Sequence, residues 1–232
     1  LAQKDLMINS KTVENSSGKI IAGRDANLHV SQLNNDTGTV YADGKLDLQA
    51  EQNVSNQQGL IAAKQALSIK GQALNNQKGQ IQSEQSDVSV NLTKTINNQS
   101  GHIQSAQALN IYSPNLNNNN GQLISGADSQ LNVTELNNQA GTIYSKKQLD
   151  VNVSATADNS VGTIAAEQNL NLNAQQLLND AGQIRSQQDQ LKLNVQNELS
   201  NLAGEISAEK AIELTANKLL NNQNGKVIAG SS

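Results

Sequence analysis

The sequence predicts an all-β chain wound as a parallel β-helix, and three observations lead to this prediction. Eleven glycines recur at intervals of 20 to 22 residues, an Asn lies three residues before each, and Ile, Val or Leu lies two residues after each. A fixed period of this length is the signature of stacked repeats. Strands of only three to five residues can be stabilised by stacking on their equivalents in neighbouring coils. We therefore expect residues 1–232 to form one solenoid of about ten coils.

Each coil is expected to contain three short segments, which the alternation of apolar and polar residues identifies. The first follows the glycine as Gly-x-Ile-x-Ala/Ser and places the small Ala or Ser at a tight corner. The second is an alternating apolar pair, such as Leu46 and Leu48. The third ends two residues before the Asn, as at Leu74. The coil would turn through three faces around an aliphatic core that is too narrow for aromatic rings.

The recurring glycines, here called anchor glycines, are expected to permit the turn between two faces. They can do so through a positive φ or through the close approach of a neighbouring segment, and the sequence leaves both open. The anchor glycines are Gly18, Gly38, Gly59, Gly79, Gly101, Gly121, Gly141, Gly162, Gly182, Gly204 and Gly225.

The asparagine before each anchor glycine has two competing interpretations. In the first, the amides form a ladder in which each donates to its counterpart in the next coil and satisfies backbone groups of the turn. In the second, a row of surface amides binds a ligand such as a sugar. Presence in every coil favours the ladder, because a ligand site would be local. The residues are Asn15, Asn35, Asn56, Asn76, Asn98, Asn118, Asn138, Asn159, Asn179, Asn201 and Asn222.

The composition argues against catalysis and against nucleic-acid binding. The net charge is −4, and the only aromatic residues are three tyrosines, so no basic surface with stacking rings is expected. Cysteine is absent, no apolar run is long enough to span a membrane, and we expect no cofactor or metal. His29 and His102 occupy different coil positions and are expected on the solvated surface. The outward acids sit in different coils with no fixed pairing, at Asp43, Glu84, Glu167 and Glu209.

A longer period divides the chain into two blocks of five coils, residues 18–120 and 121–224. Gly-Thr-Val-Tyr-Ala at 38–42 matches Gly-Thr-Ile-Tyr-Ser at 141–145, five coils later. The longest coils, of 22 residues, are likewise five coils apart. We therefore expect outward features to recur at five-coil intervals.

The third residue after each anchor glycine should point outward, because it lies between two inward positions. This position carries Ile21, Tyr41 and Ala62 in the first block, and Ile124, Tyr144 and Ala165 in the second. Two apolar patches are thus expected on one face, about 24 Å apart. They are either contacts for a partner or exposed residues of high β propensity, and the second interpretation is favoured.

The unit Leu-Asn-Asn-x-x-Gly-x-Ile-x-Ser-x-x-x-Leu-x-Leu, seen at 74–90, 116–133 and 136–151, resembles the repeats of filamentous haemagglutinins and of contact-dependent growth-inhibition effectors. This resemblance implies a right-handed β-helix within a giant exoprotein on the cell surface of a Gram-negative bacterium. It also implies export through an outer-membrane transporter of a two-partner pathway. Both ends of the sequence stop in mid-coil, as expected for a piece of a longer array.

The expected function is that of a structural shaft that presents distal binding or toxin regions, and the isolated segment is expected to be monomeric. The alternative is a binding module. In that case the faces around Tyr41 and Tyr144 would contact a cell-surface receptor, a glycan or a neighbouring filament.

Overall fold

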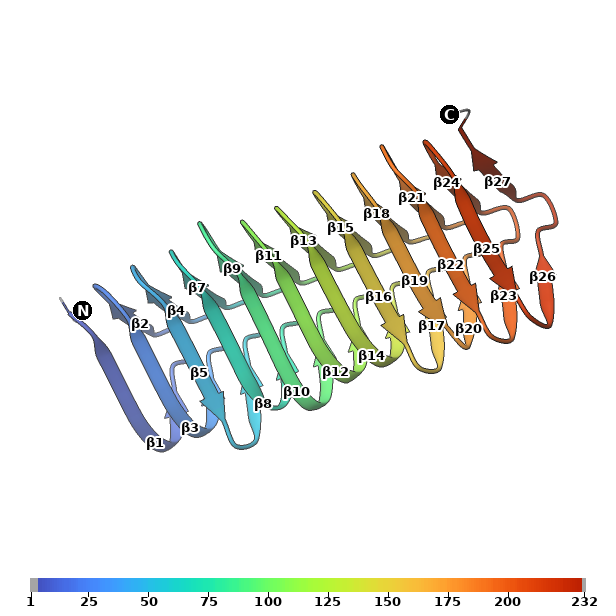
Figure 1. Cartoon of the computed structure of the whole chain (residues 1–232). Coiled ribbons are helices and arrows are strands. Elements are labelled where there is room, and N and C mark those ends of the chain that lie inside the picture. The colour runs from blue at the N-terminus through green and yellow to red at the C-terminus, as the bar shows by residue number, and fades with distance from the viewer. Residues whose placement is uncertain (1–3, 231–232) are drawn as a thin grey trace.

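The computed structural model describes residues 4–230, in which the chain contains 27 strands and no helix. The strands wind as a right-handed parallel β-helix of eleven turns, in which each strand pairs in parallel with its equivalent in the next coil (Figure 1). The predicted fold class is therefore confirmed. No helix able to cross a membrane is found in this range. Residues 1–3 and 231–232 of the predicted solenoid lie outside the described part.

The first strand of each coil belongs to an 11-stranded sheet, here called sheet A. Its strands are four residues long and begin directly after the anchor glycines. They are β2 (Lys19–Ala22), β4 (Thr39–Ala42), β7 (Leu60–Ala63), β9 (Gln80–Ser83), β11 (His102–Ser105), β13 (Gln122–Ser125), β15 (Thr142–Ser145), β18 (Thr163–Ala166), β21 (Gln183–Ser186), β24 (Glu205–Ala208) and β27 (Lys226–Ala229).

The rest of each coil belongs to a 16-stranded sheet, here called sheet B. In six coils it is one long strand: β1 (Leu6–Glu14), β3 (Ala26–Asn34), β8 (Leu67–Asn75), β10 (Val88–Asn97), β12 (Leu109–Asn117) and β14 (Ser129–Asn137). In five coils it is divided into a pair: β5 (Leu46–Ala50) with β6 (Asn53–Ser55), β16 (Leu149–Val153) with β17 (Thr156–Asp158), β19 (Leu170–Ala174) with β20 (Gln176–Leu178), β22 (Leu191–Val195) with β23 (Glu198–Ser200), and β25 (Ile212–Ala216) with β26 (Leu219–Asn221).

The second and third predicted segments therefore lie in one sheet, and the prediction of three separate faces is wrong in this respect. In the six undivided coils the backbone bends without losing its strand pairing. Longer coils take up their extra length at this bend, as a break between β5 and β6 or as an irregularity between Asn91 and Thr95 of β10. The outer side of the bend is the underside of the rod in Figure 1.

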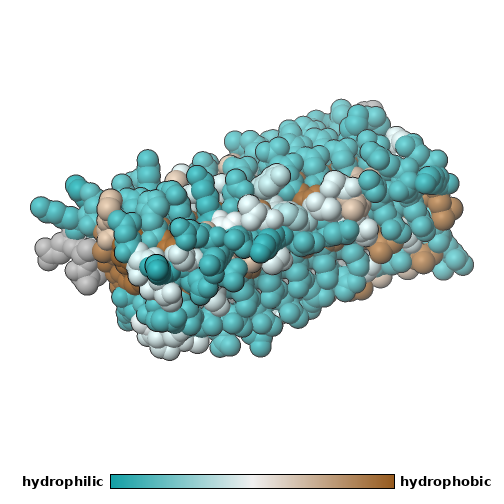
Figure 2. Space-filling model, turned by 90° about the horizontal axis from the view of Figure 1, so that it is seen from below, coloured by the Kyte–Doolittle hydropathy of each residue, from teal (hydrophilic) through white to brown (hydrophobic). Residues whose placement is uncertain are grey.

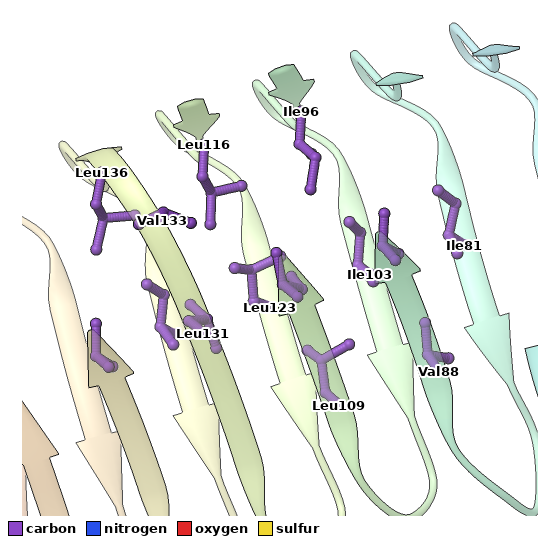
Figure 3. Packing of buried hydrophobic residues seen from close by; sticks show 14 of the residues in the cluster. Ile81, Val88, Ile96, Ile103, Leu109, Leu116, Leu123, Leu131, Val133 and Leu136 are labelled. Carbon is purple, nitrogen blue, oxygen red and sulfur yellow. The ribbon is translucent and has the colours of Figure 1, made fainter. Parts of the chain in front are cut away.

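The core is a stack of aliphatic side chains between the two sheets. Inward residues of sheet A, such as Ile81 and Ile103, pack against inward residues of sheet B, such as Val88 and Leu109, and none of these is more than 1% exposed (Figure 3). Complete burial of one such side chain stabilises the fold by about 1.5–3 kcal/mol. Within residues 4–230 no aromatic ring joins the core cluster, as the narrow cross-section predicts.

The corner at the end of each sheet A strand requires a small residue, as predicted. Where the residue is serine, its hydroxyl is buried and donates to a backbone carbonyl of the preceding coil. Ser125 Oγ, for example, donates to the Gln107 carbonyl at 2.8 Å. The corner serines thus satisfy backbone groups that the turn leaves unpaired.

Candidate interaction surfaces

The asparagines before the anchor glycines form a continuous hydrogen-bonded row inside the solenoid, here called the buried asparagine row. From Asn35 to Asn201 they are 0% exposed. Each Nδ2 donates to the Oδ1 of its counterpart in the next coil at 2.6–2.7 Å. The same nitrogen donates to a backbone carbonyl of the next coil, as Asn138 does to Thr163 at 3.1 Å. Buried amides with internal partners are not accessible to a surface ligand.

Each buried asparagine also begins a four-residue turn that the anchor glycine closes. The Gly141 amide, for example, donates to the Asn138 carbonyl at 3.0 Å. The positive φ belongs to the residue before the glycine in all eleven turns, from Ser17 (56°) to Asn224 (55°). Among residues 4–230 no glycine has a positive φ, so that part of the prediction is wrong.

Close approach of the preceding coil explains the anchor glycines instead. A Cβ atom on Gly141 would lie 2.2 Å from the Asn118 carbonyl oxygen and 2.6 Å from Asn138 Oδ1. Equivalent contacts recur at every anchor from Gly38 onward. Any side chain at these positions would therefore push two coils apart.

The two predicted apolar patches lie on the outer face of sheet A. Ile21 is in register with Tyr41, and Ile124 is in register with Tyr144. All four side chains are half-buried. The structure places them as two separate clusters and brings no residue of one into contact with the other, because three coils lie between Tyr41 and Ile124.

The outward alanines of these patches are not exposed, contrary to expectation. Ala62 is 0% and Ala165 is 4% exposed, although both side chains point away from the core. Each is the register partner of a tyrosine, Tyr41 for Ala62 and Tyr144 for Ala165. Tyr144 Oη donates to Glu167 in the coil that contains Ala165, so the phenol ring reaches across this coil and covers the alanine.

The surroundings of both tyrosines favour the neutral phenol. Desolvation raises the pKa of Tyr144 to about 12, and the hydrogen bond and negative charge of Glu167 contribute to the rise. Desolvation also raises the pKa of Tyr41, with smaller contributions from Glu84 and Asp43. Both phenols are therefore neutral hydrogen-bonding groups at physiological pH.

A second outward row, missed by the sequence analysis, runs along the bend of sheet B and is here called the groove row. It contains one residue from each coil, in register with the next. Figure 2 views the rod from this side and shows a band of less hydrophilic residues along it. The groove row consists of Asn9, His29, Gln49, Lys70, Asn91, Tyr112, Asn132, Asn152, Asn173, Asn194 and Thr215.

Two depressions lie along the groove row, and they differ in charge. The first is lined by His29 and Lys70 together with Lys11 and Glu51. The second is lined by the groove-row residues from Tyr112 to Asn173, with no Asp, Glu, Lys, Arg or His in its lining. The sequence held a signal for the second, because Asn follows the second inward residue of the strand in three successive coils, at Asn132, Asn152 and Asn173.

The second depression presents amides and an aromatic ring to solvent. Asn152 Nδ2 donates to Asn132 Oδ1 at 3.1 Å, and Asn173 Nδ2 donates to Asn152 Oδ1 at 2.9 Å. Tyr112, one rung before Asn132, is 59% exposed. This is the most exposed of the three tyrosines and lies at the end of a short polar ladder.

The ionisable residues singled out in the sequence do not assemble into a catalytic or metal site. His29 lies in sheet B and His102 in sheet A. Asp43 forms an ion pair with Lys64 at 3.0 Å, and Glu167 accepts a hydrogen bond from Tyr144. Over residues 4–230 no group of three or more His, Cys, Asp or Glu side chains could hold a metal ion.

Comparison with protein families places the whole repeat array in one group. The family model of the haemagglutinin repeat matches five overlapping segments, residues 2–58, 41–91, 85–158, 147–203 and 190–232. Together they span the chain from residue 2 to its last residue. Searches of curated proteins and of solved structures gave no significant match.

Proposed function

Because this chain belongs to the haemagglutinin-repeat family, we propose that it is a shaft segment of a large secreted surface filament. The family is structural and adhesive rather than enzymatic, and its members are secreted filamentous surface proteins. The filament would be an adhesin or a contact-dependent growth-inhibition effector of a Gram-negative bacterium. In either protein the shaft holds distal binding or toxin regions away from the cell.

The unbroken buried asparagine row is the observation that carries this proposal. Every amide from Asn35 to Asn201 bonds to the coils on both sides, and both sheets continue through all coils. Bending the rod would stretch these bonds together with the sheet ladders, which makes the solenoid stiff. Eleven turns at about 4.8 Å each give a rod of roughly 50 Å. Length is therefore set by the number of coils.

Export of such a rod requires a partner in the outer membrane. We propose that a two-partner transporter passes the chain in an unfolded state and that the coils form outside. The absence of cysteine means that no disulfide can lock a coil before export. The isolated segment would be monomeric, with no nucleic-acid partner and no cofactor.

Deletion of one block of five coils tests the shaft function. Removing residues 18–120 joins Ser17 to Gly121 and retains the Asn-x-x-Gly spacing from Asn15. The maximum dimension measured by small-angle scattering should fall by about 24 Å, with strand content per residue unchanged. Removing residues 121–224 joins Asn120 to Gly225 and should shorten the rod equally. Global unfolding of both deletion variants would contradict a modular shaft.

The second candidate function is a binding module on the outer face of sheet A. It is favoured by the recurrence of the tyrosine-over-alanine arrangement at Tyr41 and Tyr144, five coils apart. The chain should then bind target cells through a receptor, a glycan or a neighbouring filament, and Tyr41→Ala with Tyr144→Ala should abolish this binding. Cell binding that the double substitution leaves unchanged, or no binding at all, would exclude this face.

A further inference from the structure

We propose that the uncharged stretch of the groove row, from Tyr112 to Asn173, binds a neutral saccharide chain lying along the rod. This inference goes beyond the shaft function and uses neither Tyr41 nor Tyr144. It rests on the polar groups, the aromatic ring, the charge and the geometry of the second depression.

The polar groups are amides and hydroxyls with unused hydrogen-bonding capacity. Asn152 and Asn173 each spend one of two N–H bonds within the ladder, and no described residue between 4 and 230 accepts from Asn132 Nδ2. The hydroxyls of Thr134 and Ser154 are exposed beside them. Paired donors and acceptors of this kind complement the hydroxyl groups of a sugar, which also both donate and accept.

The aromatic ring of Tyr112 supplies an apolar surface next to these amides. It is 59% exposed, whereas Tyr41 and Tyr144 are each held across an alanine. Pro114, the only proline of the chain, lines the same depression. Because the C–H face of a pyranose is apolar and its edge is polar, a ring stacked on Tyr112 would direct hydroxyls to the amides.

The charge of the lining favours a neutral ligand. The second depression has no cationic side chain, so it offers nothing to offset the desolvation of a sulfate or carboxylate. An anionic saccharide would instead be attracted to Lys11 and Lys70 in the first depression. The two parts of one groove therefore differ in the class of saccharide that they would accept.

The direction of the groove favours a saccharide over an extended peptide. A peptide strand binds by pairing with a free sheet edge. Here β12, β14, β16 and β19 each have a partner on both sides, so none of them has a free edge. The groove row crosses the strands at one residue per coil, about 4.8 Å apart. This spacing is close to the length of one sugar unit, so successive units can meet successive asparagines.

The test uses the whole chain and three neutral hexasaccharides, cellohexaose, maltohexaose and chitohexaose, with a heparin-derived hexasaccharide as the charged comparison. Titration calorimetry should detect at least one neutral hexasaccharide. Tyr112→Ala should weaken its binding by about tenfold, and Asn152→Ala should weaken it several-fold. Lys70→Ala is the matched control, because it lies in the groove row outside the neutral stretch, and it should leave the affinity unchanged. All three substituted side chains point outward, so circular dichroism should show an intact fold.

Several outcomes would overturn the proposal. They are no binding of any neutral hexasaccharide, equal binding by the Tyr112→Ala variant, and tighter binding of the heparin fragment that depends on Lys70. Binding of the chain to target cells that survives periodate oxidation of their glycans, yet is lost in the Tyr112→Ala variant, would assign the groove to a protein partner instead.

Discussion

Two rows of asparagines run along this rod, and they share their hydrogen-bonding chemistry while differing in surroundings. In the buried row the amide-to-amide distance is 2.7 Å between Asn118 and Asn138, and in the groove row it is 3.1 Å between Asn152 and Asn132. The buried amides also bond to backbone carbonyls and have no contact with water. A lost partner in the groove is replaced by water, and a lost partner inside is not. The same residue therefore supports the fold in one row and is free to bind in the other.

The largest effect is expected where the backbone of one coil meets the buried row of the next. Gly141→Ala places a Cβ atom 2.2 Å from the Asn118 carbonyl oxygen, and backbone cannot move aside as a flexible side chain would. The free energy of unfolding should fall by about 4 kcal/mol or more. Gly71→Ala is the matched control, because its Cβ would meet the Ala50 carbonyl oxygen at 3.1 Å. It should cost less than about 1 kcal/mol in urea unfolding.

The comparison itself is tested by removing one amide from each row. Asn138→Ala leaves Asn118 Nδ2 without its acceptor and Asn159 Oδ1 without its donor, both buried. At about 1–3 kcal/mol for each unsatisfied group, the loss should be about 3 kcal/mol. Asn152→Ala should change stability by no more than about 0.5 kcal/mol, because water can replace the lost amide. Equal losses in the two variants would show that burial does not distinguish the rows.

A smaller effect of opposite sign is expected at the turn of the buried row. Val161 has a φ of 59°, which is strained for a β-branched residue, and its side chain is 67% exposed. Val161→Asn should raise the free energy of unfolding by about 1 kcal/mol, since Asn tolerates this region. The reverse exchange, Asn120→Val at φ 53°, should lower it by a similar amount. Thermal unfolding that moves both variants in the same direction would refute the role of φ.

The smallest effect concerns an outward residue of sheet A and appears only at high pH. The pKa of Tyr144 is raised from 10.0 to about 12 by desolvation and by Glu167. A raised folded-state pKa gives stability that is present below pH 10 and is lost as the pH rises towards 12. Phenolate absorbance should therefore show a late-titrating tyrosine that Tyr144→Phe removes, and Glu167→Gln should lower its pKa. Loss of the late phase in neither variant would contradict the Tyr144–Glu167 contact.

Several features of the rod could be predicted because they are written within single coils. The period of the anchor glycines predicts the solenoid, and alternation predicts which residues, such as Ile81 and Leu109, point inward. The small residue at each corner follows from the same local pattern. These predictions are confirmed by the parallel register of both sheets. The division into five-coil blocks and the role of the sheet A patches stay predictions.

What the sequence by itself determined is thus the winding of the chain and the inward or outward direction of each side chain. Only the tertiary structure decided what each residue meets in the neighbouring coil. It placed the positive φ before the anchor glycine, merged two predicted faces into sheet B, and buried Ala62 beneath Tyr41. It also aligned Asn132, Asn152 and Asn173 in one groove. The physical reason is that alternation is a property of adjacent residues, whereas these contacts join residues about twenty positions apart, whose alignment depends on the length of every coil between them.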